Sequence, residues 1–159
     1  MVSFSAIFST PSKLVYVAKG PFMTKKKILA VISGFVLLSA GRYLIHNVWL
    51  GTAYTNNPQL WRNQSDLLHR LWVIYLANFI LALAAVLIYL RGIENKPWAG
   101  QGLRYGVLLA LATEVPQSMI EYFVYPISQT LAWQWIVGEG GLIVLLGVLV
   151  AAICRPAAG

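Results

Sequence analysis

The sequence has little of what a soluble domain needs. Only 11% of its 159 residues are charged, against about 25% in an ordinary soluble protein. The single cysteine, Cys154, cannot form a disulfide within the chain, so a disulfide-bonded secreted scaffold is excluded. Intrinsic disorder is also excluded, because 58% of the residues are hydrophobic and 13% are aromatic. These absences indicate a membrane protein.

Long apolar runs are abundant in the sequence. A helix needs about 20 mostly apolar residues to cross the hydrocarbon layer of a bilayer. Four such runs are present, at about 28–50, 67–90, 103–125 and 131–153. They do not alternate every second residue as barrel strands would, so we expect an all-α fold. We also expect Ser65 and Asp66 to cap the second helix, and Pro116 to kink the third.

Positive charge is distributed unequally between the two ends of these runs. Short loops that stay in the cytoplasm are enriched in lysine and arginine. With four spans, both termini and the central loop share one side, which carries nine of the twelve basic residues: Lys13, Lys19, Lys25, Lys26, Lys27, Arg91, Lys96, Arg104 and Arg155. We therefore predict a polytopic up-down bundle of four transmembrane helices in a bacterial inner membrane, with both termini cytoplasmic.

The formal net charge of +7 follows from the same distribution. A nucleic-acid-binding domain would need its positive charge on one folded soluble surface, and the four spans leave no such domain. We interpret the charge as topology and as contact with anionic lipid. The expected partners are therefore the lipid bilayer and other membrane subunits or further copies of the chain, and no nucleic acid.

Residues 1–24 differ from the rest of the chain. They have an apolar start without early positive charge, which does not fit a cleaved secretory signal. Met23, followed by Thr24 and three lysines, is typical of the start of a bacterial membrane protein, so residues 1–22 are either an upstream start-site artefact or an extension. We expect residues 1–24 to be interfacial or poorly ordered, and residues 25–155 to form the transmembrane domain.

Ionisable residues inside the runs are the main functional lead, because each costs about 2.5–3.5 kcal/mol at a helix centre. Counted from the cytoplasmic ends at about 1.5 Å per residue, Arg42, Glu121 and Glu139 lie about 22, 25 and 24 Å deep. On the third span, Glu114, Gln117 and Glu121 are three, four or seven residues apart, so they lie on one face of the helix. The candidate site is a polar cluster in the outer half of the bundle: Arg42, His46, Glu114, Gln117, Glu121 and Glu139.

Two explanations of this cluster remain open. It can be a wet cavity that holds a small ligand, a proton or a lipid headgroup. Alternatively, Arg42 can pair with Glu139 or Glu121 as a buried ion pair that fixes the helix register. No catalytic residue, metal site or cofactor is predicted, although His46 and His69 lie at similar depths and are the candidate ligands for haem or a chlorophyll-type pigment.

Three stretches of the sequence resemble a group of small bacterial four-helix membrane proteins that have no assigned activity. They are the lysine cluster and early glycine of residues 25–34, the Gly-Leu-Arg-Tyr-Gly of residues 102–106, and the glycine-rich residues 125–147. The resemblance covers about residues 23–155. It implies four helices and carries no catalytic residues over to this chain.

The most favoured function is a non-catalytic accessory or interaction subunit of a membrane complex. We expect it to contact partners through small-residue faces that pair Ala30 with Gly34, Gly106 with Ala110, and Gly147 with Ala151. Gly138, Gly140 and Gly141 predict a further close helix approach beside Glu139. The alternatives are a proton-coupled small-solute carrier, a haem- or pigment-binding subunit, and an enzyme acting on lipid headgroups with Arg42 holding phosphate.

Overall fold

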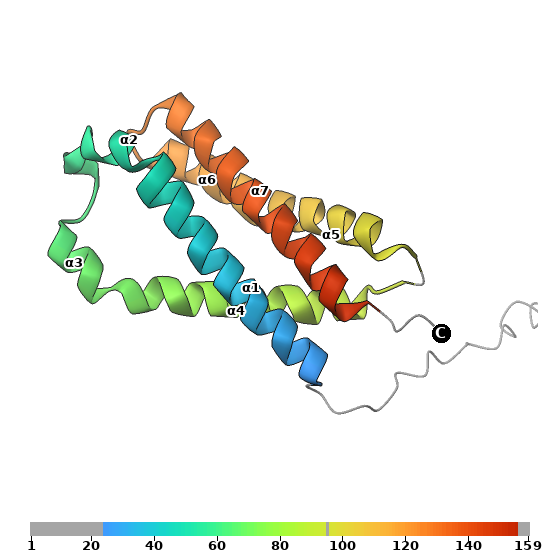
Figure 1. Ribbon diagram of the computed structural model, residues 1–159. Coiled ribbons are helices and arrows are strands. Elements are labelled where there is room, and N and C mark those ends of the chain that lie inside the picture. The colour runs from blue at the N-terminus through green and yellow to red at the C-terminus, as the bar shows by residue number, and fades with distance from the viewer. Residues whose placement is uncertain (1–23, 95, 156–159) are drawn as a thin grey trace, which may run out of the picture.

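The computed structural model describes residues 24–94 and 96–155, and this part of the chain contains helices and no strands (Figure 1). The predicted all-α class is therefore confirmed for it. The helices in order are α1 (Lys25–Tyr43), η1 (Leu44–Trp49), α2 (Gly51–Thr55), η2 (Pro58–Leu60), α3 (Gln64–His69), α4 (Leu71–Arg91), α5 (Trp98–Ala112), α6 (Glu114–Val124) and α7 (Gln129–Cys154). The prediction for residues 1–24 lies outside the described residues, except that Thr24 precedes α1.

Four helical segments of the described chain are long and apolar enough to cross a membrane, as predicted. They are Lys25–Trp49, Leu71–Arg91, Trp98–Val124 and Gln129–Cys154. The largest difference from the predicted bounds is in the third, which begins at Trp98 and not near residue 103. The helix begins directly after Pro97, whose fixed φ suits the residue before a helix.

The start of the second span differs from the prediction. The N-cap is Asn63, whose side chain accepts a hydrogen bond from the backbone N–H of Asp66, and it caps the short helix α3. Asp66 instead accepts hydrogen bonds from Arg62 and Arg70, and these hydrogen bonds lower the pKa of its carboxyl. The helix is interrupted at Arg70, so the spanning helix α4 begins at Leu71. The predicted cap at Ser65 and Asp66 is therefore wrong.

The third span is interrupted, as Pro116 predicts. A proline has no N–H to donate to the carbonyl four residues earlier, which here belongs to Ala112. Helix α5 ends at Ala112, and α6 begins at Glu114. Thr113 joins the two helices with φ −116° and ψ −73°, and its hydroxyl donates to the carbonyl of Leu109. The interruption places Glu114 in the first turn of a new helix.

Helix α7 is the central helix of the bundle and packs against α1, α4, α5 and α6. Figure 1 shows it running between α1 and the α5–α6 segment. Its contact with α5 is closest at glycines: a Cβ on Gly106 would lie 2.6 Å from the carbonyl oxygen of Val144, and a Cβ on Gly147 would lie 2.5 Å from the Cα of Gly106. These two helices therefore touch through their backbones.

This packing corrects two predictions about small residues. The faces expected to meet a partner are covered inside the chain: Ala30 and Ala151 are fully buried, and Gly34 lies against Ala82 and Leu146. The glycines beside Glu139 do not all receive a neighbour either. A Cβ on Gly138 would meet Trp49, whereas one on Gly140 or Gly141 would meet nothing within 4 Å.

The two ends of the bundle differ in composition. The basic end contains the start of α1, the connection from α4 to α5 and the end of α7 (Figure 1). The aromatic end contains α2, η2, α3 and the connection from α6 to α7. It holds its own small apolar core, made by Leu50, Ile127, Leu131, Ala132 and Trp135, with Tyr54 and Trp61 packed against it. The polar residues predicted as a site lie between this core and the middle of the bundle.

Candidate functional site

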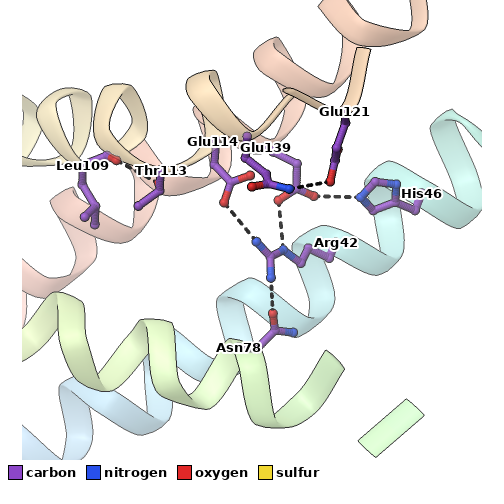
Figure 2. Close-up of polar contacts among 9 residues, drawn as sticks. Arg42, His46, Asn78, Leu109, Thr113, Glu114, Glu121 and Glu139 are labelled. Carbon is purple, nitrogen blue, oxygen red and sulfur yellow. Dashed lines mark hydrogen bonds and ion pairs between the residues drawn. The ribbon is translucent and has the colours of Figure 1, made fainter. Parts of the chain in front are cut away.

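Arg42 is the centre of the polar cluster and links all four spans. From the end of α1, its Nε donates to Glu139 of α7 at 2.9 Å, and one terminal nitrogen donates to Glu114 of α6 at 3.2 Å. The other terminal nitrogen donates to the amide oxygen of Asn78 on α4 at 2.5 Å (Figure 2). Because each of the three guanidinium nitrogens contacts a different helix, one side chain fixes the positions of the other three spans.

Glu139 is shared between two bases. Its Oε2 accepts from Arg42, and its Oε1 lies 2.9 Å from Nε2 of His46. The residue is only 5% exposed, so water cannot replace either partner. His46 belongs to η1, a π-helical turn, and such turns are rare and often occur at functional sites.

A hydrogen-bond chain continues from His46 toward the aromatic end. The hydroxyl oxygen of Tyr54 lies 2.6 Å from Nδ1 of His46 and accepts from the indole N–H of Trp135 at 2.7 Å. An indole can only donate, so the Tyr54 hydroxyl accepts from Trp135, and the same hydroxyl also hydrogen-bonds to Nδ1 of His46. Burial raises the pKa of Tyr54 to about 12, which keeps this phenol protonated. The hydrogen bonds therefore form one continuous chain from Trp135 through Tyr54 and His46 to Glu139.

Asn78 was missed by the sequence analysis. It is fully buried on α4, accepts from Arg42 and donates to the hydroxyl of Ser39. A signal was present, because Asn78 is the only amide or charged residue between Leu71 and Leu90. The hydrogen bonds by which Tyr54 and Trp135 join the cluster were not predicted either.

Gln117 and Glu121 form a second pair on α6. The amide of Gln117 donates to Glu121 at 2.9 Å, and Gln117 is exposed. Figure 2 shows the carboxylates of Glu114, Glu121 and Glu139 extending from α6 and α7 toward the first span. The partners of Arg42 are Glu139 and Glu114, so pairing of Arg42 with Glu139 is confirmed and pairing with Glu121 is not found.

The buried hydrogen-bonding atoms of the cluster all have partners. In the described part of the chain, the one buried side-chain nitrogen or oxygen without a partner is Nε1 of Trp61, which lies outside the cluster. A cavity of about 460 Å³ opens at the aromatic end beside Leu60, Ile127 and Leu131, and no cluster residue lines it. The arrangement thus favours mutual pairing over an open binding cavity.

The two histidines occupy different environments. Both ring nitrogens of His46 are engaged by Tyr54 and Glu139, whereas His69 is exposed at the end of α3. A haem or chlorophyll-type pigment ligated by His46 would have to displace one of those two partners. Among the residues described here, no three His, Cys, Asp or Glu side chains are placed to hold a metal ion.

Comparison with known protein families, with curated proteins and with solved structures found no match. The function is therefore inferred from the residues and their geometry alone.

Proposed function

We propose that this chain is a non-catalytic accessory or interaction subunit of a membrane complex in the bacterial inner membrane. In this proposal the four spans form an up-down bundle with both termini in the cytoplasm, in keeping with the excess of lysine and arginine at the basic end. The polar cluster then serves to hold the helices in register.

One observation supports this role most strongly: all three guanidinium nitrogens of Arg42 donate hydrogen bonds to side chains of the protein itself. Two carboxylates and one amide take them, and both oxygens of Glu139 are also occupied. An enzyme acting on lipid headgroups would need a guanidinium free to bind phosphate. A polar network in which each guanidinium nitrogen already has an acceptor from the protein favours a fixed helix arrangement over chemistry.

A partner surface is available on α4. Residues 71–77 are all exposed, although seven residues make nearly two turns and cover every side of a helix. They include Trp72 at 64% and Tyr75 at 50% exposure. Tyr75 touches the ring of Phe35 on α1, and Asn78 is the first residue of α4 that is buried in the bundle. We infer that the first half of α4 contacts an apolar helix of the larger complex.

Photo-crosslinking in native membranes tests this contact. A photoreactive amino acid is placed at Tyr75 and, as a matched control, at Leu108, a residue of α5 that is 66% exposed. We expect a discrete protein adduct from position 75 and none from position 108. Adducts with lipid alone at both positions, together with migration of the native protein as an isolated monomer, would refute the proposed role.

A proton-coupled carrier is the second candidate, favoured by the chain of bonds from Tyr54 through His46 and Glu139 to Arg42 and Glu114. Such a chain can pass a proton from the aromatic end to the middle of the bundle. Proteoliposomes loaded with a pH-sensitive dye test it. Proton uptake by the wild type that disappears in a folded Glu139→Gln variant would support the carrier and contradict the accessory role.

Absorbance spectroscopy tests the pigment-binding alternative directly. Protein purified gently from its native membrane should lack a haem or chlorin band if the bonds of His46 to Tyr54 and Glu139 persist. A visible band that is lost in His46→Gln, but kept in His69→Gln, would instead assign His46 as a ligand.

A further inference from the structure

Arg42 is the point at which α4 and α6 are joined. Its guanidinium donates to Asn78 of α4 and to Glu114 of α6, and among the described residues no hydrogen bond runs directly between these two helices. In the bundle α4 packs mainly on α1 and α7, and α6 packs mainly on α7. This packing leaves residues 71–77 of α4 and residues 122–124 of α6 exposed, on the side of Arg42 toward the aromatic end.

The face of α4 that contacts Arg42 continues toward the aromatic end without a partner. Ile74 and Leu71 precede Asn78 by four and seven residues, so they lie on the same face of the helix. Asn78 is fully buried, but Ile74 is 49% exposed and Leu71 is 39% exposed. This face of α4 is therefore covered at Arg42 and uncovered for about two turns beyond it.

The polar face of α6 continues in the same direction. Gln117 and Glu121 follow Glu114 by three and seven residues, and Figure 2 shows Glu121 extending from α6 on the same side as Glu114. Glu114 reaches Arg42, whereas Gln117 is exposed and Glu121 is half-buried. The open faces of α4 and α6 are defined here as Leu71, Ile74, Gln117 and Glu121.

Glu121 differs from the other carboxylates of the cluster because it has no cationic partner. Glu114 and Glu139 each pair with Arg42, whose three guanidinium nitrogens all donate to other groups. The Oε1 of Glu121 accepts from the amide of Gln117 at 2.9 Å, and no ion pair of the described chain includes Glu121. Carboxylates within membrane-spanning segments usually pair with a basic group. The open faces therefore lack one positive charge.

The position of the open faces determines what kind of protein segment can cover them. They belong to the spans Leu71–Arg91 and Trp98–Val124. A segment that lies beside them in the hydrocarbon layer has to satisfy its own backbone hydrogen bonds, so it is a helix. Apolar side chains of that helix can pack on Leu71 and Ile74, while the long stem of a lysine or arginine brings its charge to Glu121.

A second copy of this chain would not supply that cation. Between residues 28 and 90, its lysines and arginines are Arg42, Arg62 and Arg70, and between residues 105 and 154 it has none. Arg42 is fully engaged in its own bundle, and Arg62 and Arg70 both donate hydrogen bonds to Asp66. Charge complementarity therefore favours a helix from a different protein.

We propose that a transmembrane helix of another protein lies along the open faces and places a lysine or arginine beside Glu121. The inference rests on the accessory role and adds the chemistry of the partner helix. That helix is apolar where it meets α4. Because Glu121 lies one turn before the end of α6 at Val124, its basic residue lies near the membrane surface at the aromatic end.

Binding of synthetic transmembrane peptides to the full chain tests this charge. Two peptides of about 20 leucines and alanines differ at one position, one turn from an end, which holds lysine in one and glutamine in the other. Energy transfer in phosphatidylcholine vesicles measures their binding. The lysine peptide should bind the wild type about tenfold more tightly, the effect of a hydrogen bond to a charged group. Glu121→Gln should remove this difference, whereas Glu94→Gln, at the basic end, should keep it.

Two results with the peptides would overturn the proposal. Equal binding of the lysine and glutamine peptides to the wild type would show that no basic residue is recognised. This comparison needs no variant, so it decides the matter even if Glu121→Gln does not fold. A preference for the lysine peptide that survives in folded Glu121→Gln would place the cation at another site.

Photo-crosslinking from position 75 in native membranes separates this inference from the accessory role. Mass spectrometry of the adduct should identify a membrane-spanning segment of another protein, with a lysine or arginine near one end. A segment without a basic residue, or a second copy of this chain, would overturn the inference and leave an interaction role standing. Absence of any protein adduct would overturn both.

Discussion

Replacing Arg42 by glutamine tests the central role given to that side chain. The substitution removes the hydrogen bonds from Arg42 to Glu139, Glu114 and Asn78. Glutamine is shorter and uncharged, and it cannot reach three helices at once. Glu139 then keeps only His46, in a position where the residue is 5% exposed and cannot be hydrated. The consequence is a buried carboxylate with half of its partners missing.

The magnitude follows from the burial of this pair. Removing one partner of a buried ion pair costs about 3–5 kcal/mol. In a protein of this length, 1 kcal/mol corresponds to about 2–4 °C in unfolding temperature. We therefore expect Arg42→Gln to unfold about 6–20 °C below the wild type. Arg42→Lys should lie between the two, since an ammonium keeps the charge but lacks the planar fork.

Thermal unfolding in one detergent, followed by circular dichroism, is the assay. Arg62→Gln is the matched control, because it removes an exposed pair of the same type and should leave the unfolding temperature nearly unchanged. The double variant Arg42→Gln/Glu139→Gln should be more stable than Arg42→Gln alone, since it removes the orphaned carboxylate. Wild-type stability of Arg42→Gln, or strictly additive losses in the double variant, would refute the buried-pair interpretation.

Three further predictions concern other parts of the chain. Gly106→Ala should lower the unfolding temperature, because its Cβ would lie 2.6 Å from the Val144 carbonyl oxygen, whereas Gly140→Ala, with nothing within 4 Å, should raise stability by about 0.4–1 kcal/mol. The lowered pKa of Asp66 predicts that hydrogen-exchange protection of α3 is constant at neutral pH and is lost as the pH falls below 3.8; Asp66→Asn should abolish this acid dependence. The raised pKa of Tyr54 predicts that its contribution to the free energy of unfolding is intact below pH 10.0 and is lost as the pH rises toward about 12. The tyrosinate absorbance of the wild type, after subtraction of that of Tyr54→Phe, should therefore rise as the pH approaches about 12.

The sequence predicts the spans well because length and hydropathy determine them. Four apolar runs became four helices, and the lack of an N–H on Pro116 accounts for the break at Thr113. The start of the second span was misplaced because three neighbouring polar residues can each cap a helix, and only tertiary placement selects Asn63.

The sequence predicted how deep the site residues lie in the membrane, but not which neighbouring helix each of them faces. Counting residues placed Arg42 and Glu139 at similar depths, and they do form a pair. Depth does not specify which side of a helix faces which neighbour, so Glu121 was named as a possible partner of Arg42, whereas the structure pairs Arg42 with Glu114. The small-residue faces were misassigned for a related reason: glycines that allow close approach do not indicate whether the neighbour belongs to the same chain.

The central position of α7 has a consequence for how the protein is made. Arg42 precedes Glu139 by 97 residues in the chain, so during synthesis it enters the bilayer long before its main partner exists. Until α7 emerges, α1 and α5 also lack the helix on which both pack. Assembly of the bundle can therefore finish only after α7 has been synthesised, and until then we expect the insertion machinery to shelter Arg42. Deletion of α7 should send the protein to the membrane quality-control proteases, even though the other three described spans are kept.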